Sequence, residues 1–188
     1  MLAVDTNVLV YAADADSQFH TACRDWLERQ RARADAWYTT WAILYEFLRV
    51  TTHARVMRRP WSASAAWNFV AALLASPGLA LLVPTERHAD VAEEVILELP
   101  HLAGNLLHDA HTAILMREHG IGRICTRDTD FNQFPFLEVI DPLYPFDRSI
   151  VTRMGSVRVP WRVAHVARAI PRPAPFSSMN WATLPLGE

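Results

Sequence analysis

The first residue in this sequence that could do chemistry is an aspartate in an apolar segment. Asp5 lies inside the β-branched run 1–11, which predicts a buried strand. A buried carboxylate costs free energy unless it is paired or binds a metal ion. The alternative is that Asp5 caps a turn through Thr6 and Asn7, which follow it directly. The apolar surroundings favour a metal-binding or catalytic role.

Four more acidic residues stand at notable places further along the chain. Glu46 lies on an otherwise apolar face of a predicted helix, although a salt bridge to Arg49 would also explain it. Asp109 stands at the start of another helix, where the helix dipole favours an acid in any case. Asp128 and Asp130 follow a predicted strand, and a polar turn is common there. Each residue alone is weak evidence of a site.

The combination of these acids is more informative than any one of them. Such a cluster would repel itself unless a cation neutralised it. Its ligands would be hard oxygens, which favour Mg²⁺ or Mn²⁺ over zinc. A Mg²⁺ ion held by carboxylates can activate water against a phosphodiester. His108 and His111 flank Asp109 and are candidate bases, but a surface or core role suits both histidines better.

The elements that must position these acids alternate along the chain. Apolar runs predict strands over residues 1–11, 37–40, 79–84, 123–126 and 139–140. Helical periodicity predicts helices over residues 20–33, 61–76, 86–98 and 107–119, and one more around 43–50. This alternation predicts an α/β fold with a mostly parallel central sheet flanked by helices. Ligands bind at the carboxyl ends of strands in such sheets, where several of the acids fall.

The composition excludes several classes of enzyme. All 18 basic residues among the 188 are arginine, because the sequence contains no lysine. A Walker-type phosphate loop, Schiff-base catalysis and a phospho-receiver domain all use a lysine. A haloacid-dehalogenase-type phosphatase also uses one, and it needs a second aspartate where Asn7 stands. The formal net charge of −2 does not indicate a basic nucleic-acid coat.

Charge divides the chain into two unequal parts. Residues 1–147 hold 12 arginines and 19 acidic residues, a balance of −7, and form the expected folded domain. Residues 148–188 hold six arginines and one acid, a balance of +5, and are interrupted by prolines. We expect this segment to be an extended or partly disordered extension. The isolated Cys23 and Cys125, and the lack of a signal peptide or membrane span, predict a cytoplasmic protein.

Four motifs in order resemble the PIN-domain nucleases, and most closely the VapC-type toxins of toxin–antitoxin pairs. They are the opening VDTNVL at 4–9, the helical Glu46, HDA at 108–110 and TRDTDF at 126–131. The stretch 102–143 is similar to the C-terminal half of those toxins. The resemblance implies a three-layer PIN-like fold and an endoribonuclease that depends on Mg²⁺ or Mn²⁺. It also implies inhibition by a VapB-like antitoxin and a homodimer.

The resemblance also implies roles for individual residues. The catalytic acids would be Asp5, Glu46, Asp109 and Asp128. The metal ligands would be Asp5, Asp109, Asp128 and Asp130, with Asp5 and Asp109 the best candidates for direct contact. Hydrogen bonds from Thr6, Asn7 and Thr126 would orient the carboxylates. Apart from the resemblance, the acidic body offers little general affinity for RNA, so its phosphate contacts must be local. The candidate patch is Arg49, Arg55, Arg58, Arg59 and Arg127, although a solvated face explains these arginines equally well.

Several alternatives stay open at this level. The RNA target could be transfer RNA or the large ribosomal RNA. The protein could instead be a PIN nuclease of RNA processing, or a catalytically silent module that binds RNA or a partner. Residues 148–188 could contact RNA, wrap a partner subunit or have no function. An antitoxin would be expected to insert an arginine toward the acids, because a guanidinium can replace the charge of the metal.

Overall fold

The computed structural model describes residues 1–33 and 35–144, so the predicted extension 148–188 lies outside the described residues. The elements are β1 (Leu2–Val4), α1 (Thr6–Ala13), α2 (His20–Ala32), β2 (Trp37–Thr40), α3 (Trp41–Thr51), α4 (Ala63–Leu74), β3 (Leu79–Leu82), α5 (His88–Glu98), α6 (Leu106–Glu118), β4 (Arg123–Cys125), the 3₁₀ helix η1 (Thr129–Gln133) and β5 (Glu138–Ile140). None of these helices is long and apolar enough to cross a membrane.

The strands form one sheet with the order β3-β2-β1-β4-β5. Every neighbouring pair in this sheet is parallel, so the predicted mostly parallel sheet is confirmed. In the centre, Ala3 of β1 pairs with Tyr38 of β2 on one side and with Ile124 of β4 on the other. Parallel strands end at the same edge, and the chain leaves β1 and β4 there at Asp5 and Thr126.

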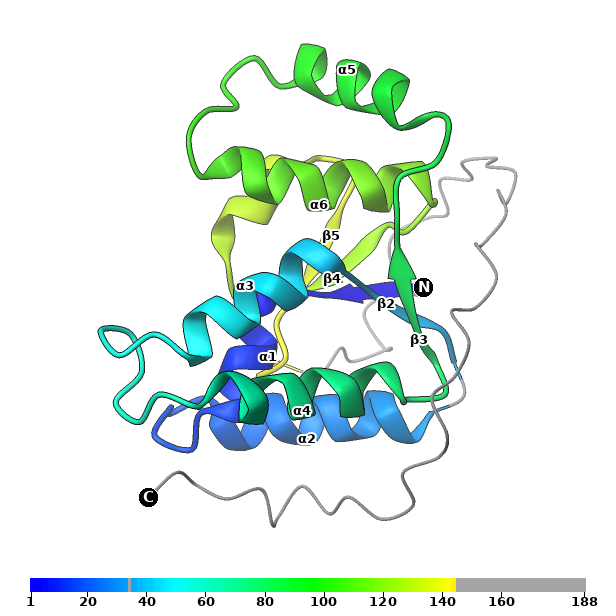
Figure 1. The fold of residues 1–188 in the computed structure, drawn as a ribbon. Coiled ribbons are helices and arrows are strands. Elements are labelled where there is room, and N and C mark those ends of the chain that lie inside the picture. Colours follow the sequence, from blue (N-terminus) through cyan, green and yellow to red (C-terminus); the bar gives the residue numbers. More distant parts are fainter. Residues whose placement is uncertain (34, 145–188) are drawn as a thin grey trace.

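Helices cover both faces of the sheet and make three layers (Figure 1). Alternate residues of a strand point to opposite faces. Val4 and Trp37 accordingly lie in the apolar core under α1 to α4, whereas Ala3 and Tyr38 lie in the core under α5 and α6. The predicted three-layer α/β fold is therefore confirmed.

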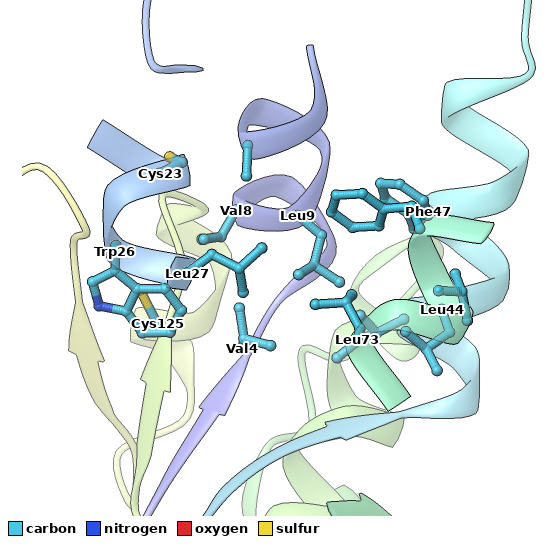
Figure 2. Packing of buried hydrophobic residues seen from close by; sticks show 14 of the residues in the cluster. Val4, Val8, Leu9, Cys23, Trp26, Leu27, Leu44, Phe47, Leu73 and Cys125 are labelled. Atoms are coloured by element: carbon cyan, nitrogen blue, oxygen red, sulfur yellow. The ribbon is translucent and has the colours of Figure 1, made fainter. Parts of the chain in front are cut away.

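The larger core fixes the helices that lead to the carboxyl edge. Figure 2 shows side chains from α1, α2, α3 and α4 converging on one apolar space. Phe47 of α3 is fully buried, stacks on Phe69 of α4 with ring centroids 4.7 Å apart, and meets Trp61 edge-on. Burying one such side chain contributes about 2–3 kcal/mol. This packing fixes the orientation of α3, which also carries Glu46.

The predicted strand over residues 1–11 was too long. The strand ends at Val4, and the same apolar run continues as helix α1. A continuous apolar run fits a buried strand and a buried helix equally well, so periodicity could not find the boundary. Asp5 creates it, because its side chain accepts a hydrogen bond from the Thr6 N–H and caps the helix.

Candidate active site at the carboxyl edge of the sheet

Asp5 is held in place by three hydrogen bonds. Its Oδ1 accepts from the backbone N–H of Thr6 at 2.7 Å. Its Oδ2 accepts from the Asn7 side-chain amide at 2.6 Å and from the Thr126 hydroxyl at 2.7 Å. The residue is only 7% exposed. Burial raises its pKa from 3.8 to about 6, even though the Thr126 and Thr6 bonds act in the other direction. Asp5 is thus both a helix cap and a carboxylate that is held charged at a cost.

Thr126 and Asn7 join the end of β4 to the start of α1. The Thr126 hydroxyl accepts a bond from the Asn7 side-chain amide at 2.7 Å and from the Asp128 N–H at 2.9 Å. The Asn7 Oδ1 accepts from the Arg127 N–H at 3.1 Å. These bonds connect residues about 120 positions apart in sequence and fix the loop that carries Asp128 beside Asp5.

Glu46 faces both the site and a neighbouring arginine. One carboxylate oxygen accepts a bond from the Thr6 hydroxyl at 3.2 Å, and the other pairs with Arg49 at 3.2 Å. Its side chain is about half exposed, at 48%. The salt bridge to Arg49 and a position at the site are therefore both present, rather than alternatives.

Asp109 lies in the first turn of α6, and its pKa is affected by all the other predicted acids. Its pKa rises from 3.8 to about 7, first because the carboxylate is partly buried. Repulsion raises the pKa further, and the acids that repel it are Asp5, Asp128, Asp130 and Glu46. The structure therefore brings together all five predicted acids, here called the acid cluster: Asp5, Glu46, Asp109, Asp128 and Asp130.

Asp128 and Asp130 lie at the start of the 3₁₀ helix η1, which sequence periodicity did not predict. The Asp128 Oδ1 accepts a bond from the Asp130 N–H at 2.9 Å and caps this helix. Asp130 is exposed, and its Oδ1 accepts a bond from Gln133 at 3.3 Å. A helix of this length is too short for periodicity to detect, and the DTD sequence reads equally well as a turn.

The acid cluster offers the donor chemistry of a divalent-cation site. In residues 1–33 and 35–144, no three His, Cys, Asp or Glu side chains form a ready-made metal site. Mg²⁺ usually keeps several waters and binds through one or two carboxylates and substrate phosphates. The buried Asp5 and the partly buried Asp109 suit that mode, because attraction to a bound cation would offset both the burial and the repulsion that raise their pKa values. The residues present therefore fit such an ion.

Arg127, one of the predicted RNA contacts, is held by partners within the domain. Its guanidinium lies over the ring of Phe19, 3.9 Å from the centroid, and its Nε pairs with Asp141 at 3.2 Å. Its backbone N–H holds Asn7. The sequence analysis did not connect Phe19 or Asp141 with the site, because each meets Arg127 only in the folded chain.

The other four arginines predicted to contact RNA differ in their surroundings. Arg49 pairs with a member of the acid cluster, and Arg59 pairs with Asp16 at 2.7 Å. Arg55 and Arg58 are exposed in the segment after α3. Two of these four arginines thus already neutralise a carboxylate of the same chain.

The two candidate histidines lie on α6 with Asp109. His111 packs edge-on against His88 of α5, with ring centroids 5.9 Å apart. Partial burial lowers the pKa of His111, and His88 and His108 add to this effect. His88 in turn bonds to the buried Glu118 at 2.8 Å. This places His111 in the packing between α5 and α6.

Comparison with known proteins agrees with this geometry. The family model described as the PIN domain matches residues 2–137. The chain belongs to the PIN domain family. This PIN protein is 37% identical over 134 residues to Ribonuclease VapC37 of Mycobacterium tuberculosis. That alignment covers 71% of this chain and 92% of the relative. The PIN protein is 36% identical over 143 residues to VapC ribonuclease Mb2897 of Mycobacterium bovis, covering 76% and 96%.

A solved structure supports the same fold. The PIN protein resembles a chain of the complex described as "Structure of FitAB bound to IR36 DNA fragment", with a TM-score of 0.56 and 17% identity. The match covers 79% of this chain and 99% of that one. At this level of identity the likeness concerns the fold, and the identities with the two VapC proteins place the chain in their family.

Proposed function

We propose that this PIN protein is an endoribonuclease of the VapC type, the toxin of a toxin–antitoxin pair, which hydrolyses phosphodiester bonds in RNA with Mg²⁺ or Mn²⁺. The observation that carries the proposal is the acid cluster itself. Burial and mutual repulsion raise the pKa of Asp5 to about 6 and of Asp109 to about 7. Uncharged side chains at these two positions would make the fold more stable, so the buried carboxylates point to a role in binding a cation and in catalysis. The family relationship to named ribonucleases supplies the substrate class.

The residues of the site divide the work between them. Asp5 and Asp109 would hold the cation, with Asp128 and Asp130 completing its shell directly or through water. When bound, the cation lowers the pKa of a water molecule and neutralises charge on the scissile phosphate. Thr126 and the Asn7 amide aim the Oδ2 of Asp5 by hydrogen bonds of 2.6–2.7 Å. Those bonds fix the carboxylate before RNA arrives.

Partners follow from the same family relationship. A VapB-like antitoxin would silence the nuclease by placing an arginine at the acid cluster, where a guanidinium can take over the charge of the cation. We also propose a homodimer, action in the cytoplasm, and transfer RNA or ribosomal RNA as the target.

Cleavage of purified total RNA tests this function. The protein would be assayed with Mg²⁺, with Mn²⁺ and with EDTA, beside Asp5→Asn and a matched Asp25→Asn control on the exposed side of α2. We expect discrete cuts that need metal, vanish in Asp5→Asn and persist in Asp25→Asn. Metal-dependent cuts that persist unchanged in Asp5→Asn would refute the assignment of the site.

A second assay separates a toxin from a nuclease of RNA processing. Expression of the wild type is expected to arrest growth, and co-expression of its antitoxin is expected to relieve the arrest. Metal binding without any turnover on total RNA would instead identify a module that only binds. Normal growth with metal-dependent cleavage would identify a processing enzyme.

A further inference from the structure

The loop between β4 and η1 carries two residues of the site with one arginine between them. Thr126 holds a carboxylate of the acid cluster by a hydrogen bond, and Asp128 is itself a member of the cluster. The side chain of Arg127, between the two, contacts Phe19 and Asp141. Phe19 lies directly before α2, and Asp141 lies directly after β5. The loop is therefore tied to two other parts of the fold through its middle residue.

Arg127 is held by two partners that are themselves fixed. Its guanidinium lies over the ring of Phe19, 3.9 Å from the ring centroid, and its Nε donates to the Asp141 Oδ2 at 3.2 Å. Phe19 packs edge-on against Tyr11 of α1, with ring centroids 5.1 Å apart. The Oδ1 of Asp141 accepts a bond from the Leu143 N–H at 2.9 Å. Phe19, Arg127 and Asp141, here called the arginine clamp, thus hold the guanidinium in one orientation.

The backbone of the same arginine supports the acid cluster. The Arg127 N–H donates to the Asn7 Oδ1 at 3.1 Å. The Asn7 amide nitrogen donates to the Asp5 Oδ2 at 2.6 Å and to the Thr126 hydroxyl at 2.7 Å. The Thr126 hydroxyl also accepts a bond from the Asp128 N–H. A shift of the Arg127 backbone would therefore change the positions of two carboxylates, those of Asp5 and Asp128.

The chain contains a second arrangement of the same chemistry at the other end of α6 from Asp109. The guanidinium of Arg117 lies over the ring of Phe136, 5.0 Å from the centroid, and pairs with Glu98 at 2.5 Å. Arg117 is in the last turn of α6, whereas Asp109 is in the first turn. Removing the Phe136 ring should therefore weaken packing without moving the acid cluster.

We propose that the arginine clamp positions the acid cluster for a divalent cation, by fixing the loop that carries Asp128 and, through Asn7, the carboxylate of Asp5. The three residues of the clamp are positioning residues, because they act through these neighbours. Mg²⁺ demands near-ideal octahedral coordination, so a displaced carboxylate binds it less well. Changes to groups that orient metal ligands typically reduce metal affinity or activity ~10–100-fold. The inference rests on the proposed function, because it takes a divalent cation as the ion that the acid cluster holds.

The test changes Phe19 rather than Arg127, because a phenyl ring carries no charge that could be lost to RNA or to the cation. Phe19→Leu removes the flat ring under the guanidinium and keeps an apolar side chain, whereas Phe19→Tyr keeps the ring. Phe136→Leu is the matched control. Mg²⁺ binding to the full chain would be measured by calorimetry without RNA. We expect Phe19→Leu to weaken binding about 10-fold, and the other two variants to bind as the wild type does.

Two further measurements separate positioning from a general loosening of the fold. Urea unfolding in EDTA is expected to show a loss of stability in both Leu variants, because each loses a ring that packs against an arginine. Cleavage kinetics are expected to show kcat lowered about 10-fold in Phe19→Leu at an unchanged KM for RNA. A similar loss of stability with different metal affinities supports the positioning role.

The outcomes separate this inference from the proposed function. Unchanged Mg²⁺ affinity in Phe19→Leu overturns the inference. An equal loss of affinity in Phe136→Leu also overturns it, because loosening of the fold would then explain both results. A raised KM at unchanged kcat overturns it as well, since the clamp would then serve RNA binding. A wild type that binds Mg²⁺ but cuts no RNA refutes the proposed nuclease, while the calorimetric comparison alone supports or overturns the positioning role.

Discussion

Replacing Asp5 by asparagine should make the protein more stable while removing its activity. Burial holds the pKa of Asp5 at about 6, against 3.8 for an ordinary aspartate. Each unit of difference between the folded and unfolded pKa corresponds to about 1.4 kcal/mol, so the charged carboxylate costs the fold about 3 kcal/mol above pH 6. Asparagine removes this cost but loses one hydrogen bond to its neighbours, worth about 1 kcal/mol. The expected net gain is about 2 kcal/mol.

The pH dependence has a definite sign. A carboxyl group with a raised folded pKa stabilises the fold while it is protonated. That contribution is complete below about pH 4, is lost as the pH rises toward 6, and stays lost above it. Urea unfolding in EDTA should therefore show Asp5→Asn gaining on the wild type between pH 4 and pH 6. Added Mg²⁺ should narrow the gap, because a ligand of the folded state stabilises only the protein that binds it.

Two results would refute this reasoning. Equal or lower stability of Asp5→Asn at pH 7.5 in EDTA would mean that the charge of Asp5 does not strain the fold. A gap that is the same at pH 4 and pH 7.5 would mean that something other than ionisation produces it. Asp25→Asn, on the exposed face of α2, is the control and should differ little from the wild type at either pH.

Four further results are expected. Mg²⁺ affinity measured by calorimetry should fall below about pH 7 and level off above it, with proton release on binding, because the ion must displace a proton from Asp109. Thr126→Val should raise the pKa of Asp5, destabilise the fold by about 1–3 kcal/mol and slow cleavage, whereas Thr126→Ser, which keeps the hydroxyl, should retain the stability and the cleavage rate of the wild type. Phe47→Ala should cost about 3–5 kcal/mol in urea unfolding, because it empties a fully buried stacked position. Arg127→Lys should slow cleavage at unchanged RNA affinity, because lysine keeps the charge but loses the flat group on the phenyl ring; weaker RNA binding would instead indicate that Arg127 contacts RNA directly.

The sequence predicted most elements because their apolar residues repeat with a clear period. The helix expected over 20–33 is α2 (His20–Ala32), and the strand expected over 37–40 is β2. The opening segment failed because an uninterrupted apolar run has no period to read. There the boundary is set by the hydrogen bond from the Thr6 N–H to Asp5, which caps the helix and cannot be read from the pattern of apolar residues.

The acids of the site could be selected from the sequence, but most of the side-chain pairings around them could not. The combination of acids at strand ends and helix starts predicted a cation site, and the resemblance to PIN-domain nucleases then pointed to Asp5 and Asp109 as its main ligands. By contrast, the pairing of Arg59 with Asp16 joins residues 43 positions apart and leaves no local trace in the sequence. The sequence could therefore not show that two of the arginines predicted to contact RNA, Arg49 and Arg59, already pair with carboxylates of the same chain.

The order of strands in the sheet has a consequence for when this protein can become harmful to the cell that makes it. The central strand β1 is synthesised first, yet one of its two neighbours, β4, comes some 120 residues later and delivers the threonine that holds Asp5. Contacts that are so distant in sequence form late in folding, after the intervening chain has been ordered. A nascent chain that has not yet reached β4 therefore has an incomplete sheet and no assembled active site. Fragments from broken messages should be equally harmless, so the danger begins only once β4 has been made and placed.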